Sequence, residues 1–276
     1  MASVHSEDNP LGKASAYPDE YDAKLLYPIE RDESWRASGE KRDQVAFYGV
    51  DIWNAYEVSW LNDKGKPVVF IAEFHIPATS RYLIESKSFK LYLNSFNQTR
   101  FKHEDEAVSR MVSDLSEAAD GSVGVILHDA SYEFPQAPKA TLLDDLDVEI
   151  TEYHPDANLL RCDAVSLNTV SERLVSHLLK SNCPVTGQPD WGSLYIEYEG
   201  QAIEHESLLA YIVSLRQHQD FHEQCVERTF RDIWLRCQPK KLIVYARYVR
   251  RGGLDINPMR SSEQQFTASN FRGFRQ

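Results

Sequence analysis

Long apolar runs are missing from this chain of 276 residues. Its apolar stretches, such as residues 68–72 and 123–127, fall far short of the roughly 18 consecutive apolar residues that a membrane-spanning helix needs. Residues 1–10 are polar and acidic, and they show neither the basic start nor the apolar centre of a secretory signal. We therefore expect a protein of the cytoplasm that does not enter a membrane.

Cysteine is scarce, and its spacing forms no C-x-x-C pair. The four cysteines are Cys162, Cys183, Cys225 and Cys237. They are too few and too irregularly spaced for a disulfide framework, so free thiols are expected. The sequence also lacks a G-x-G-x-x-G segment after a strand and a Walker sequence, so a cofactor phosphate would be held by neither a Rossmann domain nor a P-loop.

An excess of positive charge is absent from the chain as a whole. Lys and Arg number 30 against 42 Asp and Glu, a formal charge of -12 that argues against generic nucleic-acid binding. Residues 228–276 instead hold eleven Lys or Arg and three acids, a net of +8, which leaves -20 for the other residues. This basic stretch indicates a local anion site, although a solvated charged face explains it equally well.

The rest of the composition is that of a globular protein, with 42% hydrophobic and 26% charged residues. The length favours about two domains. Residues 1–45 are predicted to be an irregular lead. The elements predicted after it are a hairpin with strands at 55–61 and 67–75, a helix from residue 86, a helix at 104–119, and strands at 122–128 and 146–153.

The second half is predicted to alternate helices and strands in a similar order. Its predicted elements are a helix at 170–180, a strand at 193–198, helices at 205–217 and 221–237, and a strand at 241–249. Both halves therefore mix helices with hairpins, and the fold class is α+β. The similar order suggests an ancient duplication, although no residue-level repeat is visible.

Cys183 is the first candidate for chemistry. It lies in residues 181–192, a segment with two prolines and two glycines that we expect to be a loop following a helix. Asp190 follows in the same loop as an acid, and Trp191 could screen the pair from water. A lone cysteine is more often a small core residue, so both interpretations stand at this point. The negative end of the preceding helix dipole would not favour a thiolate.

A second cluster surrounds His218 and His222, which are expected to share one helical face, with Glu223 adjoining. Two histidines at this spacing can bind zinc. Val226, however, stands where a His-Glu-x-x-His metalloprotease has its second histidine. The metalloprotease interpretation therefore fails, and we expect no metal. A surface histidine beside a helix-stabilising glutamate is the plainer alternative.

Two further segments could hold an anion. Residues 85–92 join a strand to a helix and carry Lys87 and Lys90 on one helical face, which is typical of a phosphate site at a helix start. Residues 250–253, Arg-Arg-Gly-Gly, end a strand, where glycines let a phosphate approach the backbone and arginines grip it. Helix capping and an ordinary basic turn are the plainer explanations.

Four motifs in this order closely resemble those of the NADPH-dependent 7-cyano-7-deazaguanine reductases, the nitrile reductases of the queuosine pathway. They are residues 85–96 (ESKSFKLYLNSF), 181–192 (SNCPVTGQPDWG), 221–228 (FHEQCVER) and 245–258 (YARYVRRGGLDINP). The resemblance extends over about residues 48–260 and is specific to the long form of the family, in which the first motif precedes the cysteine loop.

This resemblance implies a tunnelling fold, with two tandem modules of β-hairpin, two helices and β-hairpin in one chain. The first module would occupy residues 46–156 and the second residues 157–276. The resemblance also implies that two copies of the chain form a homodimer. This homodimer would bind 7-cyano-7-deazaguanine and NADPH and would not contact nucleic acid directly. No metal is used by the family.

The implied reaction reduces the nitrile of 7-cyano-7-deazaguanine to 7-aminomethyl-7-deazaguanine, a precursor of a modified tRNA base, with two NADPH. Cys183 would capture the nitrile as a thioimidate, Asp190 would protonate its nitrogen, and His222 would assist proton transfer. Glu85 and Glu223, one from each module, would accept hydrogen bonds from the base. The implied substrate-binding residues are Glu85, Ser86, Lys87, His222 and Glu223, and the implied cofactor-binding residues are Lys87, Ser88, Arg251 and Gly252.

Two other functions compete with the reductase. A nitrilase-type hydrolase also uses cysteine, but it releases ammonia and an acid without any cofactor. A non-catalytic protein that binds deazapurine or tRNA on the same fold would fit the basic C-terminal stretch. The presence of both Cys183 and Asp190 argues against the binding protein.

Overall fold

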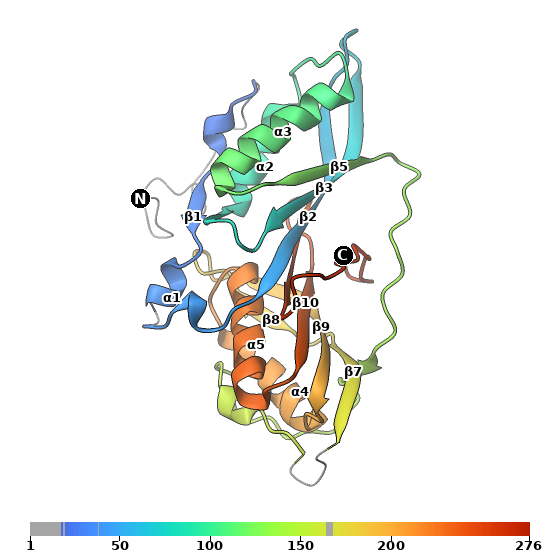
Figure 1. The fold of residues 1–276 in the computed structure, drawn as a ribbon. Coiled ribbons are helices and arrows are strands. Elements are labelled where there is room, and N and C mark those ends of the chain that lie inside the picture. Colours follow the sequence, from blue (N-terminus) through green and yellow to red (C-terminus); the bar gives the residue numbers. More distant parts are fainter. Residues whose placement is uncertain (1–17, 19, 38, 164–167) are drawn as a thin grey trace. The chain divides into compact units, whose positions relative to one another are not determined.

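The computed structural model is drawn in Figure 1, and it describes residues 18, 20–37, 39–163 and 168–276. Its mixture of helices and strands confirms the predicted α+β class. The described residues fall into two compact units. The first takes them from Met1–Lys41, Asp51–Glu133 and Arg250–Asp255, and the second from Arg42–Val50, Phe134–Val249 and Ile256–Gln276. The division into modules at residue 156 differs from these units and stays a prediction.

The first unit contains three neighbouring strands of one sheet, a separate pair of short strands, and helices. Its elements are most of β2 (Tyr48–Leu61), then β3 (Pro67–Pro77), β4 (Tyr82–Ile84), α2 (Ser86–Ser95), α3 (Glu104–Ala119) and β5 (Gly124–His128). The strands lie in the order β5-β3-β2. This confirms the predicted hairpin, both helices and the strand at 122–128. The predicted strand at 146–153 is wrong, because its alternating apolar side chains, Val148 among them, pack on the core of the second unit without a strand ladder.

Aromatic packing holds α2 on the strands of the first unit. The ring of Phe89 lies 5.1 Å from Trp53 of β2 and 5.0 Å from Phe74 of β3, centroid to centroid. Phe89, Leu93 and Phe96 are all buried, as the helical spacing predicted. This packing fixes the start of α2, where several candidate site residues lie.

Part of the predicted irregular lead is ordered. The described residues before β2 include η1 (Ala23–Leu25), β1 (Pro28–Glu30), α1 (Glu33–Ala37) and η2 (Arg42–Gln44). Strand β1 pairs antiparallel with β4, directly before α2. A buried ion pair of 2.6 Å between Arg31 and Asp51 ties this segment to β2. The prediction of irregular structure is therefore wrong for Pro28–Glu30, and residues 1–17 lie outside the described residues.

The second unit is a sheet with helices packed on it. Its elements are β6 (Thr141–Leu142), η3 (Ala157–Leu159), β7 (Thr169–Ser176), β8 (Lys180–Asn182), β9 (Pro189–Gln201), α4 (His205–Ser214), η4 (Leu215–Gln217), α5 (His222–Cys237), β10 (Lys241–Tyr248) and most of β11 (Leu254–Ser261). The strand order is β11-β10-β9-β7-β6, and β8 also pairs with β9. The helices predicted at 205–217 and 221–237 and the strand at 241–249 are confirmed.

The predicted helix at 170–180 is wrong, because this segment forms β7 and β8. Val170, Leu174 and Val175 fit a helical spacing, but they also fit a strand, and the exposure of Thr169–Arg173 alternates with a period of two. Residues 169–176 pair antiparallel with β9 along their whole length. The ladder hydrogen bonds and the half-buried face of that pairing outweigh the local helical pattern.

Candidate functional site

Cys183 and Asp190 lie on one β-hairpin of the second unit. Strand β8 pairs with the start of β9 so that Ser181 is opposite Asp190 and Asn182 is opposite Pro189. The N–H of Cys183 donates to the carbonyl of Gln188 at 2.9 Å, which continues the same register by one pair. Because side chains alternate across a strand, Cys183 is diagonal to Asp190 on the same face. The predicted loop is thus largely a hairpin, and no helix precedes it.

This hairpin face is closed to solvent. Cys183 is 6% exposed and Asp190 4% exposed. Trp191, the next residue on β9, points to the opposite face, is 40% exposed and stacks under the guanidinium of Arg216 at 5.4 Å. The expectation that Trp191 screens the pair from water is therefore wrong, because neighbouring residues of a strand face opposite sides.

Helix α5 brings His222 to Asp190. His222 is the first residue of α5, and its Nε2 lies 3.3 Å from Oδ2 of Asp190. Asp190 is buried, and the side chain of His222 is 12% exposed. A carboxylate next to the positive N-terminal end of a helix is stabilised electrostatically. An imidazole and a carboxyl at this distance can share a proton and pass it to a bound molecule.

Tyr248 supports His222 from β10, a contact that the sequence did not indicate. The two rings are stacked, with centroids 3.8 Å apart and planes at 5°. Burial raises the pKa of Tyr248 well above its usual range, and its hydroxyl lies beside the thiol of Cys225 and the hydroxyl of Ser181. The side-chain amide of Gln276 donates to the carbonyl of Tyr248 at 2.9 Å. The imidazole of His222 therefore packs on the ring of Tyr248, whose backbone carbonyl is hydrogen-bonded to Gln276.

His218 is not part of a zinc pair with His222. It precedes α5, so the two histidines share no helical face, and the expectation that they do is wrong. Burial lowers the pKa of His218 to about 3, which keeps its ring neutral. Among the described residues, no group of three or more His, Cys, Asp or Glu side chains could hold a metal ion.

Glu223 follows His222 on α5 and is only 2% exposed. The next acid along this helix, Glu227, has a structural role: it accepts bonds of 2.8 Å from both Arg42 and Arg260. The helix thus begins with His222 next to Asp190 and continues with a buried ion-pair network. This network ties α5 to Arg42 and to Arg260 of β11.

In the first unit, Glu85 caps α2. Its carboxylate accepts the N–H groups of Lys87 and Ser88, both at 2.7 Å, and the side chain is fully buried. Desolvation by burial raises the pKa of Glu85 above its usual range. Capping, the plainer alternative, is therefore present. Each carboxylate oxygen of Glu85 can accept more than one hydrogen bond, so both oxygens could still accept bonds from a ligand.

The neighbours of Glu85 differ in their access to a ligand. The Ser86 hydroxyl lies 3.4 Å from Oε1 of Glu85, and both Ser86 and Lys87 are partly exposed. The Ser88 hydroxyl is buried, donates to the Glu85 carbonyl at 2.7 Å and accepts the Tyr27 N–H at 3.0 Å. Direct contact between Ser88 and a phosphate stays a prediction.

Residues 251–254 form a tight turn between β10 and β11. The N–H of Arg251 donates to the carbonyl of Leu254 at 2.8 Å, and the reverse bond measures 3.3 Å. Gly252 and Gly253 have φ values of +61° and +89°, which identify a type I′ turn, a conformation that favours glycine at both positions. The Gly253 carbonyl accepts the N–H of Tyr56, which anchors the turn to β2.

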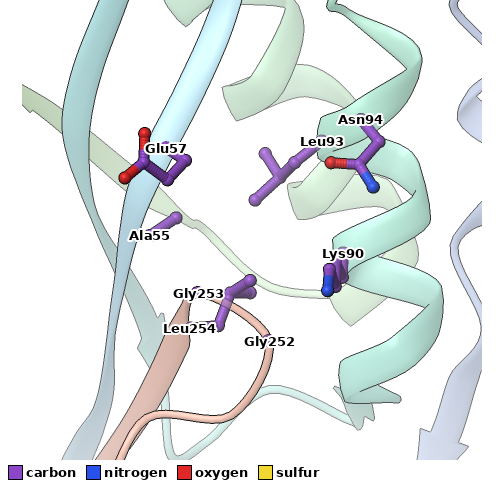
Figure 2. A pocket seen from close by; sticks show the side chains of 8 residues that line it. All are labelled: Ala55, Glu57, Lys90, Leu93, Asn94, Gly252, Gly253 and Leu254. Carbon is purple, nitrogen blue, oxygen red and sulfur yellow. The ribbon is translucent and has the colours of Figure 1, made fainter.

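This turn borders a pocket of about 320 Å³ within the first unit (Figure 2). The residues that line it are Ala55, Glu57, Lys90, Leu93, Asn94, Gly252, Gly253 and Leu254. Lys90 and Asn94 come from α2, with Lys90 opposite Gly252, while Ala55 and Glu57 come from β2. In this pocket Lys90, which the sequence indicated as part of a possible phosphate site, lies against Gly252, one of the implied cofactor-binding residues.

Part of the basic C-terminal stretch is already paired with acids. Arg260 pairs with Glu227 and Arg231 with Asp232 at 2.7 Å in buried ion pairs, and Lys241 pairs with Glu263 at 3.1 Å on the surface. Arg250, by contrast, is exposed and lies 5.1 Å from the ring centroid of Tyr56. Arg250 and the neighbouring turn therefore keep positive charge at the surface where an anion could bind.

Comparison with known proteins assigns the family. The model described as "Nitrile reductase, 7-cyano-7-deazaguanine-reductase N-term" matches residues 17–127, and the model described as "QueF-like protein" matches residues 189–267. A relative from Coxiella burnetii (strain CbuK_Q154), named NADPH-dependent 7-cyano-7-deazaguanine reductase, is 54% identical over 99% of this chain and 98% of its own. The chain belongs to the 7-cyano-7-deazaguanine reductase family.

Other members of the reductase family agree. Relatives of the same name from Azoarcus sp. (strain BH72) and Delftia acidovorans (strain DSM 14801 / SPH-1) are each 52% identical over 98% of this chain, and these matches cover 96% and 99% of the relatives. A solved structure of the apo archaeosine synthase QueF-Like aligns with a TM-score of 0.31 and 17% identity, over 37% of this chain and 99% of that one. The resemblance to the long, two-module form of the reductase family is confirmed. In the part of the chain that the structure describes, no helix has the length and apolarity to cross a membrane.

Proposed function

We propose that this chain reduces the nitrile of 7-cyano-7-deazaguanine to the amine of 7-aminomethyl-7-deazaguanine with NADPH, through a thioimidate on Cys183. The observation that carries the proposal is the hairpin face shared by Cys183 and Asp190, with Nε2 of His222 3.3 Å from the Asp190 carboxylate. A nucleophile beside an acid that is coupled to a second proton carrier is what nitrile reduction needs. The product would serve the synthesis of a modified tRNA base.

The first step is covalent capture. The Cys183 thiol passes its proton to the Asp190 carboxylate, the thiolate sulfur attacks the nitrile carbon as one π bond of the nitrile opens, and Asp190 returns the proton to the nitrogen. The weakly electrophilic nitrile is thereby converted into a thioimidate, which accepts hydride more readily. The low exposure of both side chains keeps water from hydrolysing this intermediate.

The remaining steps need protons and a leaving thiolate. Bound NADPH supplies hydride to carbon, and two hydrides with two protons convert a nitrile into a primary amine. After the first reduction, the C–S bond breaks and returns the electron pair to the sulfur of Cys183, which leaves an imine. The pair of His222 and Asp190 can supply protons to the nitrogen at each stage, because either group can be recharged through the other.

The substrate base would be held by carboxylates. Glu223, buried beside His222, and Glu85, buried at the start of α2, suit the N–H donors of a guanine-like edge. Ser86, Lys87 and His222 would complete the contacts. A buried donor edge that loses its acceptor costs about 1–3 kcal/mol, so each carboxylate has a measurable share in binding.

Glu85→Ala is expected to lower the free energy of unfolding by about 1 kcal/mol, because α2 loses its N-cap. Urea denaturation measures this loss. Glu104→Ala serves as the control, since Glu104 is the exposed first residue of α3 and is not that helix's N-cap. An unchanged unfolding free energy for Glu85→Ala would contradict the capping role.

Glu85→Asp separates capping from substrate binding. Aspartate is a good N-cap, so this variant should recover most of the stability, while its carboxylate is set back by one methylene group. Calorimetric titration with 7-cyano-7-deazaguanine should then show weaker binding in both variants. Wild-type affinity in both would remove Glu85 from the substrate site.

The residues at the turn and at the start of α2 fit the phosphates of NADPH. Gly252 and Gly253 leave the turn without side chains, and Lys87, Arg251 and the exposed Arg250 supply positive charge. A side-chain carbon at residue 252 would lie 2.7 Å from Nζ of Lys90, so the ammonium group of Lys90 would have to shift. These residues would bind the cofactor, with Ser88 contributing at the helix start.

The deciding experiment is stoichiometric. Protein, 7-cyano-7-deazaguanine and excess NADPH should consume two NADPH for each primary amine formed, and no ammonia should appear. Ammonia release without NADPH oxidation would identify a nitrilase-type hydrolase. Binding of the deazapurine without any turnover would support the non-catalytic alternative.

We further propose that the protein is a homodimer in the cytoplasm and does not contact nucleic acid directly. Light scattering on the purified protein tests the dimer.

A further inference from the structure

The side chain of Gln276 joins β10 to β11 in the second unit. It is buried, and its amide group fills all four of its hydrogen-bonding positions. The nitrogen donates to the Tyr248 carbonyl at 2.9 Å and to Oδ1 of Asn257 at 2.8 Å. The oxygen accepts bonds from Nε of Arg247 at 3.1 Å and from the Gly273 N–H at 2.9 Å. Because both of these last groups can only donate, the amide has a single orientation here.

The carbonyl of Tyr248 is satisfied by neither neighbouring strand. Tyr248 is the last residue of β10 and lies opposite Gly192 of β9. The N–H of the next residue donates to the carbonyl of Trp191 at 2.8 Å. Bonded and non-bonded pairs alternate in an antiparallel ladder, so the Tyr248 carbonyl points away from β9. On the other side, the pairing of β10 with β11 ends at Tyr245. Gln276 supplies the donor that the strands do not.

Arg275 fixes the strand that carries Asp190. Its Nη2 donates at 2.7 Å to the carbonyl of Gly192, two residues after Asp190 on β9. Gly192 also lies against the ring of Tyr248, since a Cβ atom at residue 192 would be 3.2 Å from Cδ1 of that ring. Loss of the Gln276 amide would therefore leave β9 in place and let Tyr248 move relative to it.

The position of the Tyr248 ring decides where the imidazole of His222 lies. The two rings are stacked with centroids 3.8 Å apart. A histidine ring is commonly oriented by a hydrogen bond to its second nitrogen, but Nδ1 of His222 has no such partner among the described residues. The ring of His222 is oriented instead by its contacts with Tyr248 and with Oδ2 of Asp190.

We propose that Gln276 is a positioning residue for the reduction. It fixes the place of Tyr248, and the Tyr248 ring in turn sets the distance between His222 and Asp190. The inference rests on the proposed function, because that function makes this pair the source of protons. Gln276 would act through a backbone carbonyl without touching the substrate. A displacement of about 1 Å in a catalytic group can slow a reaction by about 10²-fold, so a bond outside the substrate site can still control the rate.

The direct test reads the position of His222 by NMR, without any reaction. In protein with isotope-labelled histidine rings, the ring current of Tyr248 shifts the His222 signal upfield, and His222→Gln identifies that signal. Gln276→Ala should move the signal toward the position of an unstacked imidazole. Ser262→Ala is the control, because it also removes a side-chain bond to the backbone of β10, the one that accepts the Leu242 N–H at 3.0 Å, at the far end of the strand. It should leave the His222 signal in place.

The rate of covalent capture should change in the same variant. Gln276→Ala is expected to slow adduct formation with 7-cyano-7-deazaguanine by about 10- to 100-fold, while the affinity for this molecule changes by less than about twofold. Calorimetric titration in the Cys183→Ala background, in which no adduct forms, measures that affinity. Ser262→Ala should stay within about twofold of wild type in both measurements. An unmoved His222 signal, or an adduct rate no lower than that of Ser262→Ala, would overturn the role of Gln276.

Gln276→Glu answers the same questions if Gln276→Ala does not fold. Glutamate keeps the size of the side chain and an acceptor oxygen for Arg247, but its second oxygen cannot donate to the carbonyl of Tyr248. It should therefore also move the His222 signal and slow capture. A wild-type signal and a wild-type capture rate in this variant would contradict the positioning role.

Failure of this inference can be told apart from failure of the proposed function. If the wild-type protein forms the adduct and the Gln276 variants form it equally fast, the function stands and the positioning role is wrong. If the wild-type protein forms no adduct, the proposed function is wrong. The NMR signal of His222 then still decides whether Gln276 holds the stacked rings in place.

Discussion

Mixing the protein with 7-cyano-7-deazaguanine in the absence of NADPH is expected to add the mass of one substrate molecule, and Cys183→Ala is expected to abolish that addition and all turnover. Without the thiolate no bond to the nitrile carbon forms, and without NADPH the thioimidate cannot proceed. Intact-protein mass spectrometry measures the adduct directly. An unmodified mass under saturating substrate would rule out the covalent mechanism.

The other cysteines make this test selective. Burial raises the pKa of Cys225 and of Cys237 to about 12, and burial also raises the pKa of Cys162. These three thiols therefore keep their protons at neutral pH and are poor nucleophiles. Cys162→Ala is the matched control, because Cys162 is more exposed than Cys183 and would be the first site of non-specific modification. Loss of the adduct in Cys162→Ala would move the nucleophile away from Cys183.

Asp190→Asn is expected to slow adduct formation by about 10²- to 10⁴-fold, the usual contribution of a general acid. Asparagine keeps the size of the side chain next to His222, but it has no acidic proton to give to the nitrile nitrogen. Rapid-quench mass spectrometry of the adduct isolates this step from hydride transfer. The first-order rate of adduct formation is the quantity to compare.

The control for Asp190 lies on the same strand. Glu197→Gln also exchanges a carboxylate for an amide on β9, but its side chain is 44% exposed and pairs with Arg173 at the surface. Its adduct rate should stay within about twofold of wild type, because exposed ion pairs contribute little. A wild-type rate for Asp190→Asn would transfer the proton donation to His222.

Several elements were predictable because their pattern is local. The helix Glu104–Ala119 was predicted with the bounds that the structure has, since its apolar residues recur on one helical face. The hairpin of β2 and β3 followed from strand-forming residues around a turn with Gly65 at φ +78°. In these segments the residues that decide the structure lie within a few positions of one another.

Other elements depended on distant partners. Residues 169–176 satisfy both a helical and a strand pattern, and only their pairing with β9 decides between the two. Strand β11 was not predicted, because a proline and two charged residues interrupt its apolar pattern. Its antiparallel pairing with β10 holds it in the sheet nevertheless. Where local preference is weak, the ladder of hydrogen bonds determines the outcome.

The sequence by itself determined the chemistry available to this protein: a cysteine and an aspartate in one short segment, two acids that suit a guanine-like base, and a basic turn with two glycines. Only the tertiary structure decided that His222 reaches Asp190, that Tyr248 supports His222, and that Lys90 lies against Gly252. Each of these contacts joins segments that are far apart along the chain. Their distances follow from strand register and helix packing, which the spacing of residues within one segment does not contain.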